Sequence, residues 1–212
     1  MAFKNTVVLK HPLVDDYITR IRDRRTSYLD FRLYVDKLSL MLAYETSKEL
    51  SLKDRKIRTP LCDFTGKELS ENIVLVPILR AGLGLLNGFN QVFTNAMVSH
   101  IGIYRNEESL QPVKYYFKFP RLRSIHNSIV FILDPMLATG GSANCTISEV
   151  KKIGVKKIII ASLVSAPEGV REIGRKNKDV KIYTCALDKK LNKSGYIVPG
   201  LGDAGDRQFG TG

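Results

Sequence analysis

The sequence predicts an α/β fold in which a central parallel sheet is covered by helices on both faces. Apolar runs of strand length alternate with segments of helical periodicity, and this alternation is typical of parallel sheets. Two of these runs, Ile73–Leu79 and Ile129–Leu133, each lead into a glycine turn and then into a helical pattern. Ligands of parallel sheets collect at such turns, beyond the carboxyl ends of the strands.

The composition indicates one compact domain, 1–212. The chain has 212 residues, of which 44% are hydrophobic, so it can bury a sizeable core without a second full domain. Its three cysteines are odd in number and widely spaced, which argues against a disulfide scaffold or a zinc cluster. No window approaches the about 18 apolar residues of a membrane span. We therefore expect a cytoplasmic protein that does not engage membranes.

A net charge of +12 leaves several anionic partners open. The basic residues are scattered through the segments Arg20–Arg25, Lys53–Arg58, Lys151–Lys157 and Arg171–Lys181 rather than gathered in one tail. Most are expected on solvated helix faces. A positive field would also steer a phosphorylated substrate toward the protein. The charge alone does not decide between nucleic acid, lipid and a small polyanion.

The first elements are two helices and a strand. A helix from Leu13 to about Arg24 is followed by a longer amphipathic helix that Thr26 or Ser27 can cap. The longer helix has one apolar face, made by Phe31, Tyr34, Val35, Leu38 and Leu42. The polar and basic stretch Leu50–Lys67 is expected to be a surface excursion. Ile73–Leu79 is then a buried strand, and the helix after its glycine turn runs to about Phe93.

The remaining elements continue the alternation. Strands are expected at Val98–Tyr104, Val113–Phe119, Ile129–Leu133, Lys157–Val164 and Val180–Ala186. A helix from Ala143 to Lys152 follows the third of these. The first two strands are expected to form a projecting hairpin, with Tyr115, Tyr116, Phe117 and Phe119 near its end. Aromatic residues on a protruding arm need a partner surface, so we expect a homodimer or a larger even-numbered assembly.

The segment Asp134–Ser142 is the most informative motif. An apolar strand ends in the carboxylate of Asp134, and the turn Thr139-Gly-Gly-Ser142 then opens the helix at Ala143. A helix N-terminus offers unpaired N–H groups and a partial positive charge, and glycines let the backbone approach an anion closely. Because a carboxylate would repel a phosphate, Asp134 is expected to face sugar hydroxyls or a cation. The motif therefore predicts a sugar-phosphate site. In the alternative interpretation, Thr139 or Ser142 merely caps the helix.

Two further segments extend this site. Arg80 follows the strand Ile73–Leu79 in a second glycine turn, where it could grip the more highly charged end of a doubly phosphorylated ligand. The C-terminal segment Tyr196–Gly212 is rich in glycine and contains Asp203 and Asp206. Its residues Tyr196, Leu201 and Phe209 are expected to anchor it, as a closely wrapped loop that presents main-chain donors and acceptors.

Together these segments resemble the signature blocks of the uracil phosphoribosyltransferase family. The blocks are Val76–Gly84, Tyr104–Ser109, Asp134–Ser142 and Gly200–Arg207, and the resemblance spans nearly the whole chain. It implies a type I phosphoribosyltransferase fold, with a parallel sheet flanked by helices and a smaller hood formed largely by about 187–212. The implied reaction joins uracil to 5-phosphoribosyl 1-pyrophosphate, giving UMP and pyrophosphate, with Mg²⁺ on the phosphoribosyl donor.

The resemblance also implies residue roles. Ala138–Ser142 would hold the 5′-phosphate, Asp134 the ribose hydroxyls, and Arg80 and Arg105 the pyrophosphate. Asp203 would join the donor site through the metal, and Arg105 and Asp203 would be the catalytic residues. The full donor set is Arg80, Arg105, Asp134, Pro135, Met136, Leu137, Ala138, Thr139, Gly140, Gly141, Ser142 and Asp203. The uracil set is Ile197, Gly202, Asp203 and Ala204, acting largely through main-chain groups. A cis peptide is expected at Leu79–Arg80.

Two other functions compete with this reading of the residues. Another base-specific phosphoribosyltransferase would share the phosphate loop but should lack the segment Gly200–Asp206. A regulatory RNA-binding protein on this fold would explain the charge of +12, and it predicts a contiguous basic face. The complete set of site residues argues against pure regulation, so a nucleic-acid partner is not expected. The resemblance also implies GTP as a further partner, because GTP is an effector of some relatives.

Overall fold

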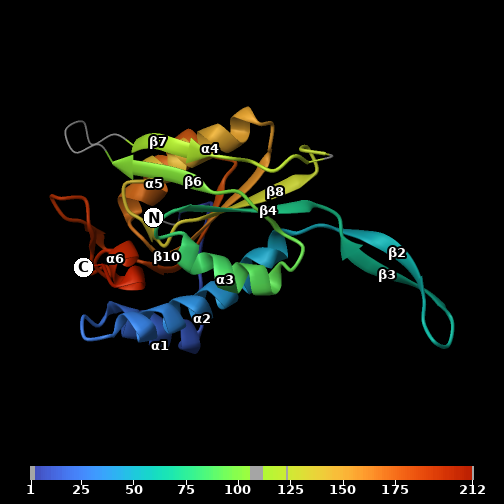
Figure 1. Ribbon diagram of the computed structural model, residues 1–212, viewed down its shortest axis with the longest axis horizontal. Coiled ribbons are helices and arrows are strands. Elements are labelled where there is room, and N and C mark those ends of the chain that lie inside the picture. Colours follow the sequence, from blue (N-terminus) through green and yellow to red (C-terminus); the bar gives the residue numbers. More distant parts are fainter. Residues whose placement is uncertain (1–2, 106–111, 123, 212) are drawn as a thin grey trace.

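The computed structural model describes residues 3–105, 112–122 and 124–211, and a mostly parallel sheet lies at its centre (Figure 1). The strand order is β1-β11-β10-β8-β4-β6-β7, and all neighbours are parallel except the antiparallel pair β6 and β7. In this order the strands span Thr6–Val8, Lys181–Leu187, Lys157–Ser165, Ser128–Leu133, Asn72–Leu79, Ile101–Arg105 and Pro112–Phe117. Two short strands, β5 (Met97–Val98) and β9 (Met136–Leu137), pair with β4 and β10.

Helices cover both faces of the sheet, as expected. One face carries α1 (Pro12–Arg22), α2 (Tyr28–Thr46) and α3 (Leu83–Val92), and the other carries α4 (Gly141–Lys152) and α5 (Pro167–Lys176) (Figure 1). Side chains of a strand alternate between faces, and both faces are buried here. The central strands are therefore continuously apolar rather than alternating in polarity.

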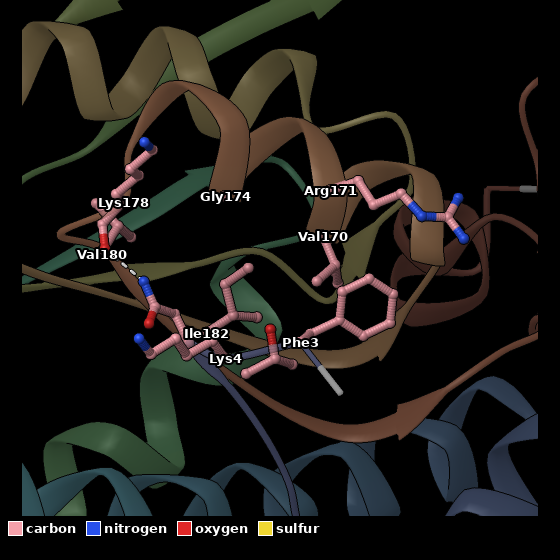
Figure 2. Close-up of a pocket in the computed structure, with 10 residues that line it drawn as sticks. Phe3, Lys4, Val170, Arg171, Gly174, Lys178, Val180 and Ile182 are labelled. Carbon is pink, nitrogen blue, oxygen red and sulfur yellow. Dashed lines mark hydrogen bonds between the residues drawn. The ribbon is translucent and has the colours of Figure 1, made fainter. Parts of the chain in front are cut away.

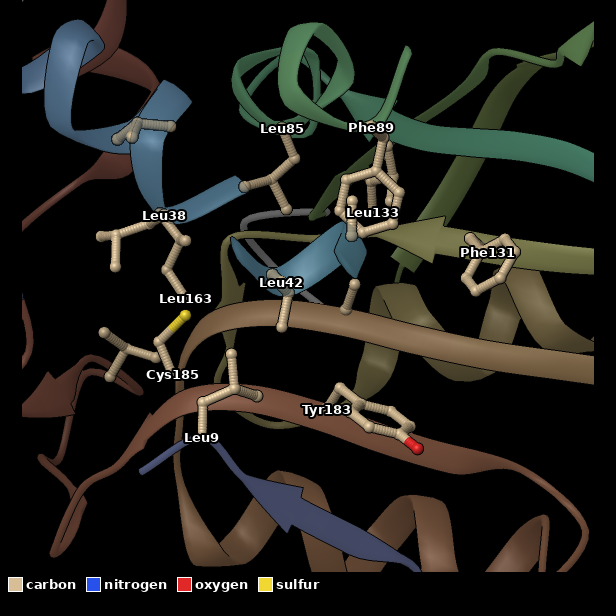
Figure 3. Close-up of a cluster of buried hydrophobic side chains, with 14 of the residues drawn as sticks. Leu9, Leu38, Leu42, Leu85, Phe89, Phe131, Leu133, Leu163, Tyr183 and Cys185 are labelled. Carbon is tan, nitrogen blue, oxygen red and sulfur yellow. The ribbon is translucent and has the colours of Figure 1, made fainter. Parts of the chain in front are cut away.

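The core beneath α1, α2 and α3 is shown in Figure 3. Leu38 and Leu42 of α2 belong to the same buried cluster as Phe131 of β8, and the rings of Phe93 and Phe131 stack with centroids 5.0 Å apart. Burial of one such side chain stabilises the fold by roughly 1.5–3 kcal/mol. The predicted apolar face of α2 is confirmed, although Tyr34 is only partly buried.

Local capping sets the ends of the first two helices. Pro12 occupies the first turn of α1, and the His11 ring accepts a hydrogen bond from the Leu13 amide at 3.1 Å. Ser27, one of the two expected caps, accepts a hydrogen bond from the Asp30 amide at 3.1 Å and begins α2. The helices therefore start close to the predicted residues.

The projecting arm differs from the prediction. The stretch expected to be a surface excursion forms an antiparallel hairpin, β2 (Leu52–Arg58) and β3 (Asp63–Leu69), which extends away from the body of the protein (Figure 1). The expected pairing of β6 with β7 is confirmed, but these strands continue the central sheet instead of projecting from it. The reason is that β6 also pairs with β4, and α4 packs against β7.

The bounds of other elements also differ from the prediction. The expected strand Val98–Tyr104 is divided into β5 and β6 at Ser99 and His100, although the Ser99 amide still donates to the Leu75 carbonyl of β4 at 2.8 Å. Neither β1 nor α5 was predicted as an element. β1 is three residues long, and it gains its hydrogen-bonded partner only from β11 at the sheet edge.

The C-terminal segment forms a small unit above the sheet. It contains the antiparallel pair β12 (Lys190–Leu191) and β13 (Ile197–Val198), followed by α6 (Ala204–Phe209), which contacts α2. Leu201 is 4% exposed and anchors the segment in the core. The same expectation was wrong for Tyr196 and Phe209, which are 52% and 39% exposed. Within the described residues, no helix is both long and apolar enough to cross a membrane.

Candidate active site

Three chain segments meet at the carboxyl edge of the sheet. We call Arg80–Gly82 the arginine turn, Ala138–Ser142 the phosphate loop, and Pro199–Asp203 the terminal loop. The arginine turn follows β4, and the phosphate loop lies beyond the end of its neighbour β8. A side chain at Gly82 would collide with the carbonyl of Leu133, so the arginine turn packs directly against the end of β8. Two adjacent parallel strands thus deliver both predicted ligand-binding turns to one place.

The phosphate loop presents an open helix N-terminus. Gly140 takes the left-handed conformation with φ of 80° and is the N-terminal cap of α4, and as a glycine it has no side chain to make a capping hydrogen bond. The Gly141 amide makes only a long contact of 3.4 Å with Thr139 Oγ1. Gly140, and not Thr139 or Ser142, is therefore the cap residue, and the long Thr139 contact leaves the first amides of α4 able to bind an anion.

Helix α5 supports the phosphate loop from behind. An added Cβ at Gly169, in the first turn of α5, would overlap the carbonyl oxygen of Ala138. Ile173 of the same helix lies 3.5 Å from the place where a Cβ of Gly140 would be. The absence of a side chain at Gly169 lets the helix approach the loop backbone, which fixes the position of the loop amides.

Asp134 lies at the end of β8 in a desolvated position. Burial raises the pKa of its carboxyl from 3.8 to about 6, and the amide of Met136, 3.4 Å from Oδ1, opposes this rise only weakly. The carboxylate therefore has little hydrogen bonding of its own at neutral pH. Such a group gains from donors brought by a ligand, and sugar hydroxyls are donors of this kind.

Arg80 faces the C-terminal helix. Its Nη2 lies 3.2 Å from Oδ1 of Asp206 in α6, and its side chain is 60% exposed. The Leu79–Arg80 peptide is cis, as expected. An exposed guanidinium with one loosely held carboxylate partner is available for phosphate oxygens, because a bidentate phosphate contact is stronger than a surface ion pair.

A cavity of about 330 Å³ is lined by the terminal loop and by the segment that leads into the phosphate loop. All four residues predicted to contact uracil line it, together with Met136 and Ala138 of the predicted donor set. Ile197 and Ala204 are buried, whereas Gly202 and Asp203 are exposed at its rim. Asp203 also caps α6, because its Oδ1 accepts a hydrogen bond from the Asp206 amide at 3.0 Å.

The cavity also has walls that the sequence did not indicate. Ser194, Gly195 and Tyr196, in the turn between β12 and β13, line it opposite the terminal loop. The Asn192 side chain holds this turn by accepting hydrogen bonds from the amides of Ser194 at 3.0 Å and Tyr196 at 2.9 Å. The pattern Asn-x-Ser-Gly was the available signal, since asparagine and glycine together are typical of tight turns.

The other predicted donor residues divide into two groups. Thr139, Gly140, Gly141 and Ser142 form the phosphate loop and the start of α4. Pro135 and Leu137 are buried, and the Pro135 carbonyl accepts hydrogen bonds from Leu163 and Val164 in β10. They hold the loop in place rather than facing a ligand with their side chains. The side chain of Arg105, at the end of β6, and residues 106–111 lie outside the described part of the chain.

A magnesium ion fits these residues only if the bound substrate supplies some of its ligands. In the described part of the chain, no group of three or more His, Cys, Asp and Glu side chains could hold a metal by itself. Mg²⁺ commonly keeps several waters and takes one or two protein carboxylates together with substrate phosphates. The exposed carboxylate of Asp203, at the rim of the cavity, suits an ion of that kind.

A separate cavity of about 510 Å³ lies between the N-terminal segment and α5 (Figure 2). Phe3, Lys4, Arg171 and Lys178 are among its lining residues, and the Arg171 guanidinium lies 5.8 Å from the centre of the Phe3 ring. None of the predicted site residues lines it. The cavity beside the terminal loop therefore remains the candidate active site.

Comparisons with known proteins identify the family of the whole chain. The family model of uracil phosphoribosyltransferase matches residues 8–211. A uracil phosphoribosyltransferase of Acholeplasma laidlawii is 48% identical over 205 residues, covering 97% of this chain and 98% of that protein. One from Malacoplasma penetrans is also 48% identical and covers 97% of this chain and 99% of that protein. The solved structure of the AQ2163 protein of Aquifex aeolicus has a TM-score of 0.90 at 41% identity, covering 96% of this chain and 97% of that one.

Proposed function

The chain belongs to the uracil phosphoribosyltransferase family, and we propose that it transfers the 5-phosphoribosyl group of 5-phosphoribosyl 1-pyrophosphate to uracil, giving UMP and pyrophosphate. The observation that carries this proposal is the cavity of about 330 Å³. It places main-chain groups of the terminal loop beside the segment that leads into an uncapped helix N-terminus. A planar base and a phosphorylated sugar are the two ligands that such an arrangement suits.

The donor is assigned to the carboxyl edge of the sheet. The amides of the phosphate loop would bind the 5′-phosphate, and Asp134 would accept hydrogen bonds from the ribose hydroxyls. Arg80 would exchange its contact with Asp206 for the pyrophosphate, and Arg105 would bind the same group. Residues 187–212 would act as the hood over this site.

Catalysis would then depend on positioning and charge. Displacement of pyrophosphate at the anomeric carbon builds positive charge on the sugar, so the reaction needs a fixed ribose, a neutralised leaving group and little water. The guanidinium of Arg80 would offset the charge of the departing pyrophosphate. Uracil N1 can attack a nearly formed cation without a strong general base, so no histidine is needed in the site.

Magnesium is proposed to enter with the donor. Asp203, at the rim of the cavity, is the carboxylate that would hold it, and Asp134 is left to the ribose hydroxyls. When bound, it would supply positive charge to the pyrophosphate oxygens.

Uracil is proposed to be recognised by main-chain groups of Ile197, Gly202 and Ala204. Cytosine carries a donor where uracil O4 is an acceptor, so a cytosine in this site would leave a buried group unpaired. A mismatch of this kind can lower kcat/KM by up to ~10⁴-fold. The experiment is conversion of labelled uracil to labelled UMP, with and without the phosphoribosyl donor. Equal turnover of cytosine, or efficient use of hypoxanthine, would contradict the assignment.

The exposed apolar side chains of the β2–β3 arm argue for a homo-oligomer. Leu61 at its tip is 96% exposed, and Leu52, Ile57, Phe64 and Leu69 are between 44% and 61% exposed. A two-stranded hairpin with this many exposed apolar side chains is marginal alone, and it gains stability when a second subunit covers it. We propose a homodimer or a larger even-numbered assembly.

The remaining partners follow from the family and the composition. GTP is proposed as an effector, and its effect on the initial rate of UMP formation tests this directly. All three cysteines are free, which fits the proposed cytoplasmic location.

A further inference from the structure

Two arginine side chains bind consecutive carbonyl oxygens of the terminal loop. Arg22, the last residue of α1, donates from Nη1 to the carbonyl oxygen of Gly200 at 2.7 Å. Arg207, in α6, donates from Nη1 to the carbonyl oxygen of Leu201 at 2.9 Å. These carbonyls belong to the two residues before Gly202, which lines the cavity assigned to uracil. The two guanidinium groups therefore act on the segment that presents Gly202.

Arg22 is itself held by a buried carboxylate. Asp188 binds Nη2 through Oδ1 at 2.6 Å and Nη1 through Oδ2 at 2.8 Å. Its Oδ2 also accepts a hydrogen bond from the Gly200 amide at 2.8 Å. The Asp188 side chain is only 5% exposed, so the geometry of this pair is strongly constrained. Gly200 is thus bound at both its amide and its carbonyl.

Arg207 is fixed against the helices below the terminal loop. It donates to the carbonyl oxygen of Ile21, and from Nη2 to that of Asp23 at 2.7 Å. These carbonyls lie at the end of α1, and that of Asp23 also accepts a hydrogen bond from the Thr26 amide at 3.1 Å. The guanidinium also lies 4.5 Å from the centre of the Phe31 ring. A single planar group therefore connects the end of α1, the core face of α2 and the terminal loop.

The terminal loop needs such external support. Gly200 and Gly202 have φ values of 62° and 82°, in the left-handed region that glycine enters freely. Glycines that reach these conformations also reach many others, so the loop does not set its own shape. Recognition by main-chain groups depends on their direction, because the amide and carbonyl vectors must match the edge of the base.

We infer that Arg22 and Arg207 are positioning residues for uracil, which hold the main chain of Gly202 in the orientation that accepts uracil and rejects cytosine. They do so through the carbonyls of Gly200 and Leu201, and neither residue lines the uracil cavity. The inference rests on the proposed function, because it assumes that uracil binds beside the terminal loop. It predicts that substitution of Arg22 or Arg207 changes KM for uracil more than KM for the phosphoribosyl donor.

The first test is Arg207→Lys. A lysine ammonium keeps the charge but lacks the planar fork that reaches three carbonyls at once. We expect KM for uracil to rise about tenfold or more, in line with the loss of charged hydrogen bonds. KM for the phosphoribosyl donor should stay within about twofold, and the ratio of uracil to cytosine turnover should fall. Arg20→Lys is the matched control, because Arg20 lies in the same helix α1 and contacts Asp16 and the Tyr34 ring rather than the terminal loop.

Asp188→Asn is the second probe. Asparagine keeps the shape of Asp188 but places a donor against either Arg22 or the Gly200 amide, and it should show the same selective rise in KM for uracil. This variant decides the question if Arg207→Lys does not fold. The wild-type protein is measured first, so that failure to form UMP counts against the proposed function alone. An active wild type combined with variants that only lower Tm, or raise both KM values equally, overturns the inference.

Discussion

Replacement of Asp134 with asparagine should stabilise the protein at neutral pH while it impairs catalysis. Burial raises the pKa of this carboxyl to about 6, because the folded protein gives its charge little solvation. Asparagine has nearly the same shape and carries no charge. A site residue whose removal improves folding is the expected result where function requires a charge in a dry position.

The size of the stability effect follows from the pKa. A rise from 3.8 to about 6 is roughly two units, and one unit corresponds to ~1.36 kcal/mol. Between these two pH values the folded state holds more protons than the unfolded state, so the free energy of unfolding decreases as the pH rises. At pH 7 the ionised Asp134 therefore costs about 3 kcal/mol relative to pH values below 4. In a domain of this size, that difference corresponds to ~6–12 °C in Tm.

The effect on activity should have the opposite sign. If Asp134 binds the ribose hydroxyls, Asp134→Asn loses a charged acceptor worth roughly 1.5–3 kcal/mol, and a misplaced anomeric carbon adds to the loss. We expect kcat/KM to fall by about 10²-fold. In the wild type, affinity for the donor should increase as the pH rises through about 6, because only the ionised carboxylate accepts from both hydroxyls.

Urea unfolding from pH 4.5 to 7.5, paired with steady-state kinetics, tests both effects. The stability difference between Asp134→Asn and wild type should be largest at pH 7 and shrink as the pH falls toward 4. Asp16→Asn is the control, because this exposed carboxylate pairs with Arg20 at the surface. Equal stability of wild type and Asp134→Asn at pH 7 would refute the desolvation argument. A fully active Asp134→Asn enzyme would refute the ribose assignment.

Three further predictions follow from the site and the arm. Thr139→Ala should raise KM for the donor by about 3–10-fold with a smaller change in kcat, because the 5′-phosphate is bound alike in the ground and transition states, and steady-state kinetics measure this. Gly169→Ala should destabilise the protein by roughly 1–3 kcal/mol in urea unfolding and also raise KM for the donor, because the new methyl group would push on the phosphate loop. The double substitution Leu61→Ser and Phe64→Ser should shift the protein toward monomers in analytical ultracentrifugation, and an unchanged sedimentation coefficient would show that the arm is not the interface.

The sequence predicts the central strands well because their physical requirement is simple. A strand that is buried on both faces is expected to be mainly apolar, and five of the six residues of β8 and six of the nine of β10 are apolar. The strands of the arm are the opposite case, because they are mostly exposed rather than buried. All seven residues of β2 are exposed, so no apolar alternation marks it as a strand. Its stability comes from pairing with β3, which a local pattern does not reveal.

Local sequence patterns also do not reveal which residues hold the candidate site in place. Motifs identified Asp134 and the phosphate loop, but the burial of Asp134 depends on strands and loops packed around it in three dimensions. The contact between Arg22 and Asp188 joins residues 166 positions apart, at the end of one helix and the end of a strand. Each looks like an ordinary surface charge in the sequence. Only the fold shows that they meet below the terminal loop.

The glycines explain why the site was nonetheless visible in the sequence. A side chain at Gly82, Gly169 or Gly200 would collide with a main-chain carbonyl oxygen, and Gly140 needs a left-handed conformation. The candidate site is therefore built mainly from backbone that passes close to other backbone, and glycine is the one residue that permits this. Substitution at these positions changes the shape of the site rather than removing a chemical group. A glycine-rich pattern marks where a ligand binds, whereas the residues that hold that backbone in place carry no pattern of their own.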